Sequence, residues 1–162
     1  MAAITQTVSQ ELLAEQAGKL LLSGGTLGSV YDYTEKDYEA LYAIGHSLYS
    51  QARYGDAVQA FGFLVMHNHL ERRFVKAFAS SLQMVRNYSE AINYYALATA
   101  MDMTDLAPSF HVCECLLAQG KVQEAREGLE MIAAQCEGEE QEALKRRAQG
   151  LLSVLPGTGT KQ

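Results

Sequence analysis

The sequence predicts an all-α fold made of stacked helix pairs, and two observations carry this prediction. Composition is the first: only 2 of the 162 residues are proline, whereas the strong helix formers alanine, leucine, glutamate and glutamine are abundant. Valine and isoleucine are sparse and scattered, which leaves little material for a sheet. A repeat is the second, because Ala57, Ala91 and Ala125 follow one another at intervals of 34 residues.

The repeat extends to both sides of each alanine. The matching positions in the three copies are Ile44, Phe78 and Val112; Gly45, Ala79 and Cys113; Leu48, Leu82 and Leu116; and Phe61, Tyr95 and Leu129. Small residues fit where two helices cross closely, and one helix pair does not bury its apolar face by itself, so the pairs must stack. This pattern is typical of the tetratricopeptide repeat (TPR). We therefore expect a TPR superhelix of three helix-turn-helix repeats.

The repeats are expected within residues 36–137, and each should contain two helices. Pro108 fits the first turn of a helix, where its missing N–H is no loss, and Gly120 suits the left-handed turn that follows a helix. The expected repeats are about 38–71, 72–105 and 106–137, with helices at 35–51 and 54–66, at 71–85 and 89–101, and at 108–119 and 122–135.

Helical segments are also predicted on both sides of the repeats. In the N-terminal segment, residues 1–35, Ser9 can cap a leucine-rich helix that runs to Leu22 and ends at the glycine pair 24–25, and a short helical turn is expected at 27–31. A C-terminal capping helix at 139–154, within a segment 138–155, should cover the last repeat, and residues 156–162 should form a flexible tail.

Charge and hydropathy exclude several classes of partner. The net charge is −6 and the pI near 5.2, and a nucleic-acid surface would need a basic patch, so no nucleic-acid partner is expected. No apolar run approaches the roughly 18 residues that span a bilayer, and the first ten residues lack the pattern of a secretion signal, so no membrane insertion is expected. Three cysteines without a framework indicate reduced thiols in a cytoplasm.

We find no convincing catalytic, metal or cofactor site in the sequence. His67 and His69 stand near a helix end without a nearby carboxylate or thiol pattern, and Cys113 and Cys115 should point in roughly opposite directions from one helix. The glycine pair before Thr26 lacks the strand and the lysine of a phosphate-binding loop. The chain is therefore expected to act by binding and not as an enzyme.

The first helix of the first repeat carries a second stripe beside its expected core stripe of Leu41, Ile44, Gly45 and Leu48. In a TPR this second face lines the concave surface, where tyrosines offer a large apolar area with a polar tip. Tyr54 and Tyr95 either add to this wall or pack between repeats. The stripe residues are Tyr42, His46 and Tyr49, and the matching faces of the next two repeats are Lys76, Ser80 and Gln83, and Phe110, Glu114 and Leu117.

The sequence resembles the class II chaperones of bacterial type III secretion, the SycD/LcrH/IpgC-like family. The likeness covers roughly residues 10–155. It rests on the phrase Leu-Leu-Ser-Gly-Gly-Thr-Leu at 21–27, on Leu-Tyr-Ala-Ile-Gly at 41–45 with the later Tyr49, and on Glu-Cys-Leu-Leu at 114–117. Three repeats with these flanks are more specific than the repeats alone.

The resemblance implies a cytoplasmic bacterial chaperone that holds two hydrophobic, pore-forming translocator proteins through an extended segment with proline and leucine anchors. It also implies a homodimer of the free protein and a role with a transcriptional activator, as in some members. A generic TPR adaptor remains the alternative. Family members often carry an aromatic residue where this chain has His46. The residues implied to line the anchor pockets are Tyr42, His46, Tyr49, Tyr54, His69 and Tyr95, with Lys76, Gln83, Phe110 and Leu117 as further groove candidates.

Overall fold

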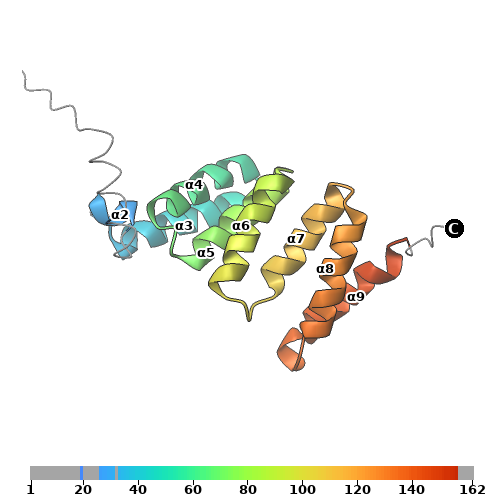
Figure 1. Cartoon of the computed structure of the whole chain (residues 1–162). Coiled ribbons are helices and arrows are strands. Elements are labelled where there is room, and N and C mark those ends of the chain that lie inside the picture. Colours follow the sequence, from blue (N-terminus) through green and yellow to red (C-terminus); the bar gives the residue numbers. More distant parts are fainter. Residues whose placement is uncertain (1–18, 20–25, 32, 157–162) are drawn as a thin grey trace, which may run out of the picture.

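The structure is a computed structural model that describes residues 19, 26–31 and 33–156. Every regular element in this part of the chain is a helix, which confirms the all-α prediction. The helices form three antiparallel pairs that stack in chain order, and one further helix follows the last pair (Figure 1). Their bounds are α2 Leu27–Val30, α3 Glu35–Ser50, α4 Tyr54–His67, α5 Arg72–Met84, α6 Tyr88–Met101, α7 Ala107–Ala118, α8 Val122–Gln135, η1 Glu139–Gln141 and α9 Glu142–Val154.

The helices of the three repeats begin and end within one residue of the expected ranges. The expected C-terminal helix is divided instead, because a 3₁₀ turn at Glu139–Gln141 precedes α9. The leucine-rich helix expected at 9–22 lies outside the described residues except for Lys19, which is helical. Within the described part, Thr34 and Asp37 form a capping box that fixes the start of α3.

The 34-residue period is visible in the backbone of the turns between paired helices. Ala52, Arg86 and Gly120 occupy the same place in the three repeats and have positive φ angles of 59°, 62° and 77°. The N–H of the residue after each of them donates back across the turn to the carbonyls of Leu48, Leu82 and Leu116, at 2.9 Å in every case. This hydrogen-bond pattern closes the end of a helix. It requires one residue in the left-handed backbone conformation, which glycine adopts most easily.

Small residues allow the paired helices to approach closely, as the sequence predicts. A Cβ atom on Gly45 of α3 would lie 2.7 Å from Cε1 of Phe61 on α4. In the third pair the roles are exchanged, because a Cβ on Gly128 of α8 would lie 2.6 Å from Sγ of Cys113 on α7. The three alanines that define the repeat, at 57, 91 and 125, are fully buried.

The helices bury two apolar clusters that meet at α7. The first cluster joins α3 to α6 around Phe61, Phe74 and Tyr95, and it includes Cys115 of α7. The second joins α7, α8 and α9 and includes Cys113 from the opposite side of α7. α9 therefore covers the apolar face that the third helix pair would otherwise expose, which is the role expected of a capping helix.

One residue of the expected core stripe is not in the core, because Ile44 is 54% exposed. Its counterpart in the second repeat, Phe78, is buried and packs against Gly62 in the preceding helix α4. In the described part of the chain, no helix pair precedes α3 to cover Ile44 in the same way. The buried stripe of α3 instead starts one turn earlier, with Tyr38.

Candidate functional site

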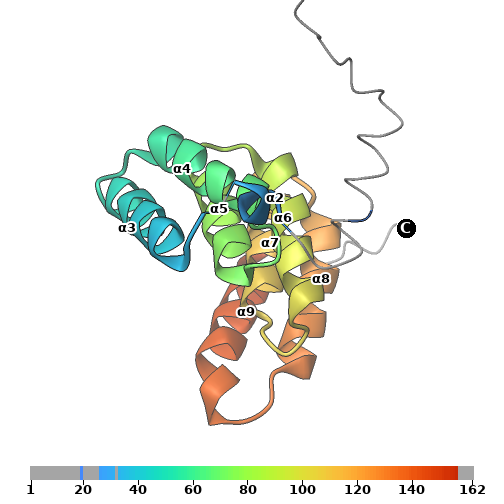
Figure 2. The ribbon, with the colours of Figure 1, turned by 90° about the vertical axis from the view of Figure 1, so that its left-hand side faces the viewer.

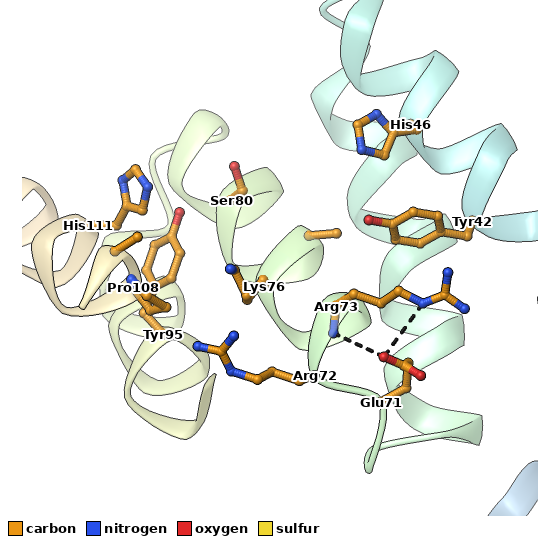
Figure 3. A pocket seen from close by; sticks show the side chains of 12 residues that line it. Tyr42, His46, Glu71, Arg72, Arg73, Lys76, Ser80, Tyr95, Pro108 and His111 are labelled. Carbon is orange, nitrogen blue, oxygen red and sulfur yellow. Dashed lines mark hydrogen bonds and ion pairs between the residues drawn. The ribbon is translucent and has the colours of Figure 1, made fainter. Parts of the chain in front are cut away.

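The first helices of the three pairs, α3, α5 and α7, together line a hollow of about 600 Å³. We call this face of the array the inner face, and the face of α4, α6 and α8 the outer face. In Figure 2, α3 and α9 lie on the same side of the array. Figure 3 shows the side chains that surround the inner hollow: Tyr42, His46, Glu71, Arg72, Arg73, Lys76, Ser80, Tyr95, Pro108 and His111, with Ala77 and Ala107 also lining it.

Tyr42 and His46 form the wall that α3 contributes. Tyr42 is half-buried, and its ring lies 5.6 Å from the rings of Phe61 and Phe74 between centroids. His46 is exposed and lies edge-on to Tyr42 at 5.4 Å. The guanidinium of Arg73 sits 5.1 Å from the centre of the Tyr42 ring, a distance at which the cation and the ring attract each other. The predicted aromatic stripe therefore faces the hollow, but Tyr42 also supports the core.

Tyr95 forms the floor of the hollow from α6. Its side chain is 2% exposed, its ring stacks on that of His111 at 5.1 Å, and its hydroxyl donates to Oε1 of Gln83 at 2.8 Å. Burial raises the pKa of Tyr95 far above its ordinary value, so the hydroxyl remains a neutral donor. The sequence left open whether Tyr95 lines the groove or packs between repeats. In the structure most of the Tyr95 side chain packs between repeats.

A smaller recess of about 120 Å³ lies beside the main hollow, lined by His46, Tyr49, Phe61, Ala77 and Ser80. The hydroxyls of Tyr49 and Ser80 lie 3.0 Å apart and share a hydrogen bond that joins α3 to α5. The ring of Tyr54 on α4 packs edge-on against Tyr49 at 5.2 Å. Tyr54 thus supports the recess from behind and does not line it.

The cations of the inner hollow have acidic partners within the protein. Lys76 Nζ lies 2.8 Å and Arg72 3.0 Å from the same carboxylate oxygen of Asp105. Burial raises the pKa of Asp105, but the hydrogen bonds from Lys76, Ala107 N–H and Arg72 outweigh this effect and hold the pKa below its ordinary value. Arg73 pairs with Glu39 of α3. The hollow is therefore a mixed polar and aromatic surface and not a phosphate site.

A hydrogen-bonded chain continues from this floor towards α9. Gln83 donates to Glu114 at 3.3 Å, and His111 Nδ1 lies 2.7 Å from the same carboxylate. Arg147 of α9 reaches the other oxygen of Glu114 at 3.4 Å. These contacts fix the orientation of Gln83 and His111, so the polar groups of the inner face are held in place before any partner binds.

Besides Tyr54, three further predicted groove residues do not lie in the groove. Phe110 is 1% exposed and belongs to the second core cluster, and Leu117 packs against the same cluster. The reason is α9, whose Arg147 lies 4.4 Å above the Phe110 ring and which covers the face of α7 that the repeat register assigns to the groove. His69 lies on the outer face, in a hollow between α4 and α6, because the chain has already left α4 at Asn68.

Sequence reasoning missed Arg72, Pro108 and His111 as lining residues. Pro108 precedes the positions of α7 that match the first-repeat stripe, and His111 corresponds by the 34-residue period to Ala43, which lies between Tyr42 and His46. In the part of the chain that the structure describes, no group of three His, Cys, Asp or Glu side chains is placed to hold a metal ion. Nor is any described helix long and apolar enough to cross a membrane.

Comparison with known proteins agrees with the repeat pattern and adds the family. The family model of the tetratricopeptide repeat matches residues 74–105, which is the second pair of helices. Low calcium response locus protein H of Yersinia pestis is 30% identical over 155 residues, which cover 93% of this chain and 89% of that protein. The chaperone protein SicA of Salmonella typhimurium is 28% identical over 96% of this chain and 92% of its own length.

The similar solved structures include chaperones of type III secretion. The type III secretion translocator chaperone SycD of Yersinia enterocolitica superposes with a TM-score of 0.71 at 28% identity, over 80% of this chain and 97% of SycD. This chain belongs to that chaperone family. The chain is also similar to PcrH in its complex with the chaperone binding region of PopD, with a TM-score of 0.67 at 29% identity over 76% of this chain and 93% of PcrH. Its relatives are chaperones, which places it among binding proteins and not among enzymes.

Proposed function

We propose that this protein is a cytoplasmic chaperone of type III secretion that holds hydrophobic translocator proteins by an extended segment in its inner groove. The observation that carries the proposal is the groove itself, an aromatic and polar hollow of about 600 Å³ built from three successive repeats. Relatives of the same fold have been solved with such cargo, PcrH with the chaperone binding regions of PopD and PopB, and SycD with a peptide of the translocator YopD.

The groove suits an extended segment for physical reasons. The recess of about 120 Å³ between Tyr49 and Ala77 has room for one aliphatic or proline side chain. Beside it, the hydroxyl of Ser80 and the ammonium of Lys76 can bond to the backbone of a bound strand, as Gln83 can further along the groove. A proline-containing strand is already extended, so its ordering costs little on binding. The cargo's apolar segment is thereby kept away from water and from premature membrane contact.

Partner-binding roles follow from the geometry. Tyr42, His46 and Tyr49 would contact the segment directly. Tyr95 would support it from the floor, and Tyr54 would hold Tyr49 in place. We propose two hydrophobic translocators as cargo, with the free chaperone as a homodimer, in line with the SycD relative for which an alternative dimer has been solved. A role with a transcriptional activator is a further proposal that rests on the family resemblance.

Filling the small recess gives a sharp test. Ala77→Leu places three more carbon atoms in a space of about 120 Å³ without removing any side chain that supports the core. The matched control is Ala134→Leu, at an exposed position of α8 outside the groove. Each variant is co-expressed with the translocators of the same secretion system, and the translocator that copurifies is quantified.

We expect Ala77→Leu to lose at least about tenfold in bound translocator, because an anchor that does not enter its pocket forfeits 1.4 kcal/mol or more. Ala134→Leu should bind like the unchanged protein, and circular dichroism should show both variants folded. Equal binding by a folded Ala77→Leu variant would exclude the recess as an anchor site. Failure of the unchanged protein to retain any translocator would favour a generic TPR adaptor.

A further inference from the structure

The outer face carries an apolar hollow that the groove mechanism does not use. It has a volume of about 770 Å³ and lies between α4 and α6, with Phe78 of α5 beneath it. Its rim includes Phe63, Met66 and Leu97, which are 38%, 62% and 41% exposed. Large apolar side chains grouped around a hollow on a protein surface mark a place where another element docks.

The N-terminal part of the chain reaches the described structure at the edge of this hollow. Helix α2 packs against the end of α4, where a Cβ on Gly28 would meet the Tyr38 ring and the carbonyl oxygen of His67. Tyr33 continues the contact, with its ring 5.8 Å from Phe63, a residue that also lines the hollow. The 25 residues that precede Thr26 are therefore joined to a part of the structure that lies next to Phe63, one of the residues that line the hollow.

The sequence of those residues fits the hollow. Leu13, Ala17, Leu20 and Leu21 follow the spacing i, i+4, i+7 and i+8, so that in a helix they form one apolar stripe. The opposite face would carry Glu11, Glu15 and Lys19, with Leu22 at the end of the helix; of these, Lys19 is described by the structure, and it is helical and exposed. The glycine pair 24–25 permits the chain to reverse direction before α2.

We propose that residues 9–22 form an amphipathic helix that docks its leucine stripe into the outer hollow between α4 and α6 of its own chain. A helix of this length extends about 21 Å, and neighbouring helices pack about 8–10 Å apart, so it can lie in the groove between α4 and α6. The docked helix covers the apolar rim while the inner groove stays open. This inference does not depend on the proposed cargo of the inner groove.

Disulfide trapping tests the docking in the full-length protein. Ala17→Cys on the proposed stripe is combined with Leu97→Cys on the rim, and the matched control combines Ala17→Cys with Ala134→Cys, at an exposed position of α8 outside the hollow. The three native cysteines are buried, so they should compete little for the new thiols. Under mild oxidation we expect an intrachain disulfide in the first pair and none in the control.

A disulfide between two chains in the first pair would assign the hollow to the segment of a second copy and overturn the intrachain proposal. Equal yields in both pairs would overturn it as well. As a second readout, Leu97→Cys alone should react with a thiol reagent at least about tenfold faster when residues 1–25 are deleted, which corresponds to 1.4 kcal/mol of docking free energy. Protection of this thiol that requires an added translocator would assign the hollow to cargo and likewise overturn the proposal.

Discussion

The turn residue between paired helices shows how single positions carry the repeat. Gly120 occupies it without strain in the third repeat, whereas Ala52 and Arg86 adopt the same left-handed conformation with a Cβ atom. For a residue with a side chain this conformation costs roughly 1–2 kcal/mol. The 2.9 Å bond that each turn makes to the preceding helix maintains the geometry in spite of that cost.

At this turn position, a change to glycine should therefore raise the free energy of unfolding, and a change from glycine to alanine should lower it. Arg86→Gly should raise the free energy of unfolding by about 0.5–1 kcal/mol, because the relieved strain exceeds the extra entropy of glycine in the unfolded chain. Gly120→Ala should lower it by about 1 kcal/mol. Urea unfolding followed by circular dichroism measures both. Gly55→Ala is the control: it lies in α4 with free space around it and should be stabilising or neutral. A neutral Gly120→Ala would contradict the left-handed turn.

At the scale of one element, α7 differs from the other described helices because it contributes buried residues to both apolar clusters. Cys113 points into the second cluster and Cys115 into the first, as the two-residue spacing predicts. Burial raises the pKa of each thiol to about 11. Both thiols are thus packing groups that join the two cores, and neither is a nucleophile at neutral pH.

This burial predicts a loss of stability at alkaline pH. At about pH 8 and below both thiols are mostly protonated in the folded and in the unfolded chain, because an ordinary thiol has a pKa near 9. Between pH 9 and 11 the unfolded chain releases these protons while the folded chain keeps them, so the unfolded state is favoured. Since one pKa unit corresponds to about 1.4 kcal/mol, the free energy of unfolding should fall by about 2 kcal/mol or more across this range.

Urea unfolding at about pH 8, 9.5 and 10.5 measures the alkaline loss. The double variant Cys113→Ala with Cys115→Ala provides the control. It should be less stable at pH 8, because two buried sulfur atoms are removed, but its stability should depend less on pH. If the free energy of unfolding of the double variant falls with pH as much as that of the unchanged protein, then groups other than Cys113 and Cys115 cause the alkaline loss.

At the scale of the whole molecule, the array is a row of pairs in which each contacts its neighbours, with two clusters that share α7. Stability in such a row is close to a sum of units and interfaces. The position of a destabilising substitution along the array should therefore decide how many of the helix pairs unfold. Ala91 in the first cluster and Ala148 of α9 in the second are both fully buried, so the same substitution can be compared at the two sites.

We expect Ala91→Glu to unfold the array, because a buried, unpaired carboxylate costs on the order of 3 kcal/mol or more and Ala91 lies where α6 packs within the first cluster. Ala148→Glu should release α9 and loosen α7 and α8 while α3 to α6 keep their protection from hydrogen exchange. Ala134→Glu, at an exposed position, should leave exchange unchanged. A wild-type thermal midpoint for Ala91→Glu would mean that the repeat register is wrong.

The sequence alone determined the repeat, the helices and the type of inner-face residue. A period of 34 fixed which positions must be small and which must be apolar, and stacking leaves such a pattern few other solutions. For this reason the helices expected at 54–66 and 122–135, which the structure has at 54–67 and 122–135, and the inward position of Tyr42, His46 and Tyr49 could be predicted without any tertiary contact.

Only the tertiary structure decided what happens at the ends of the array, where the period no longer applies. Phe110 and Leu117 occupy groove positions in the repeat register, yet α9 packs over that face and buries them in the core. Ile44 occupies a core position, yet no preceding pair in the described part of the chain covers it. A repeat specifies the environment of a residue through its neighbours on both sides, so the sequence pattern is reliable inside the array and fails where one neighbour is missing or is replaced by a cap.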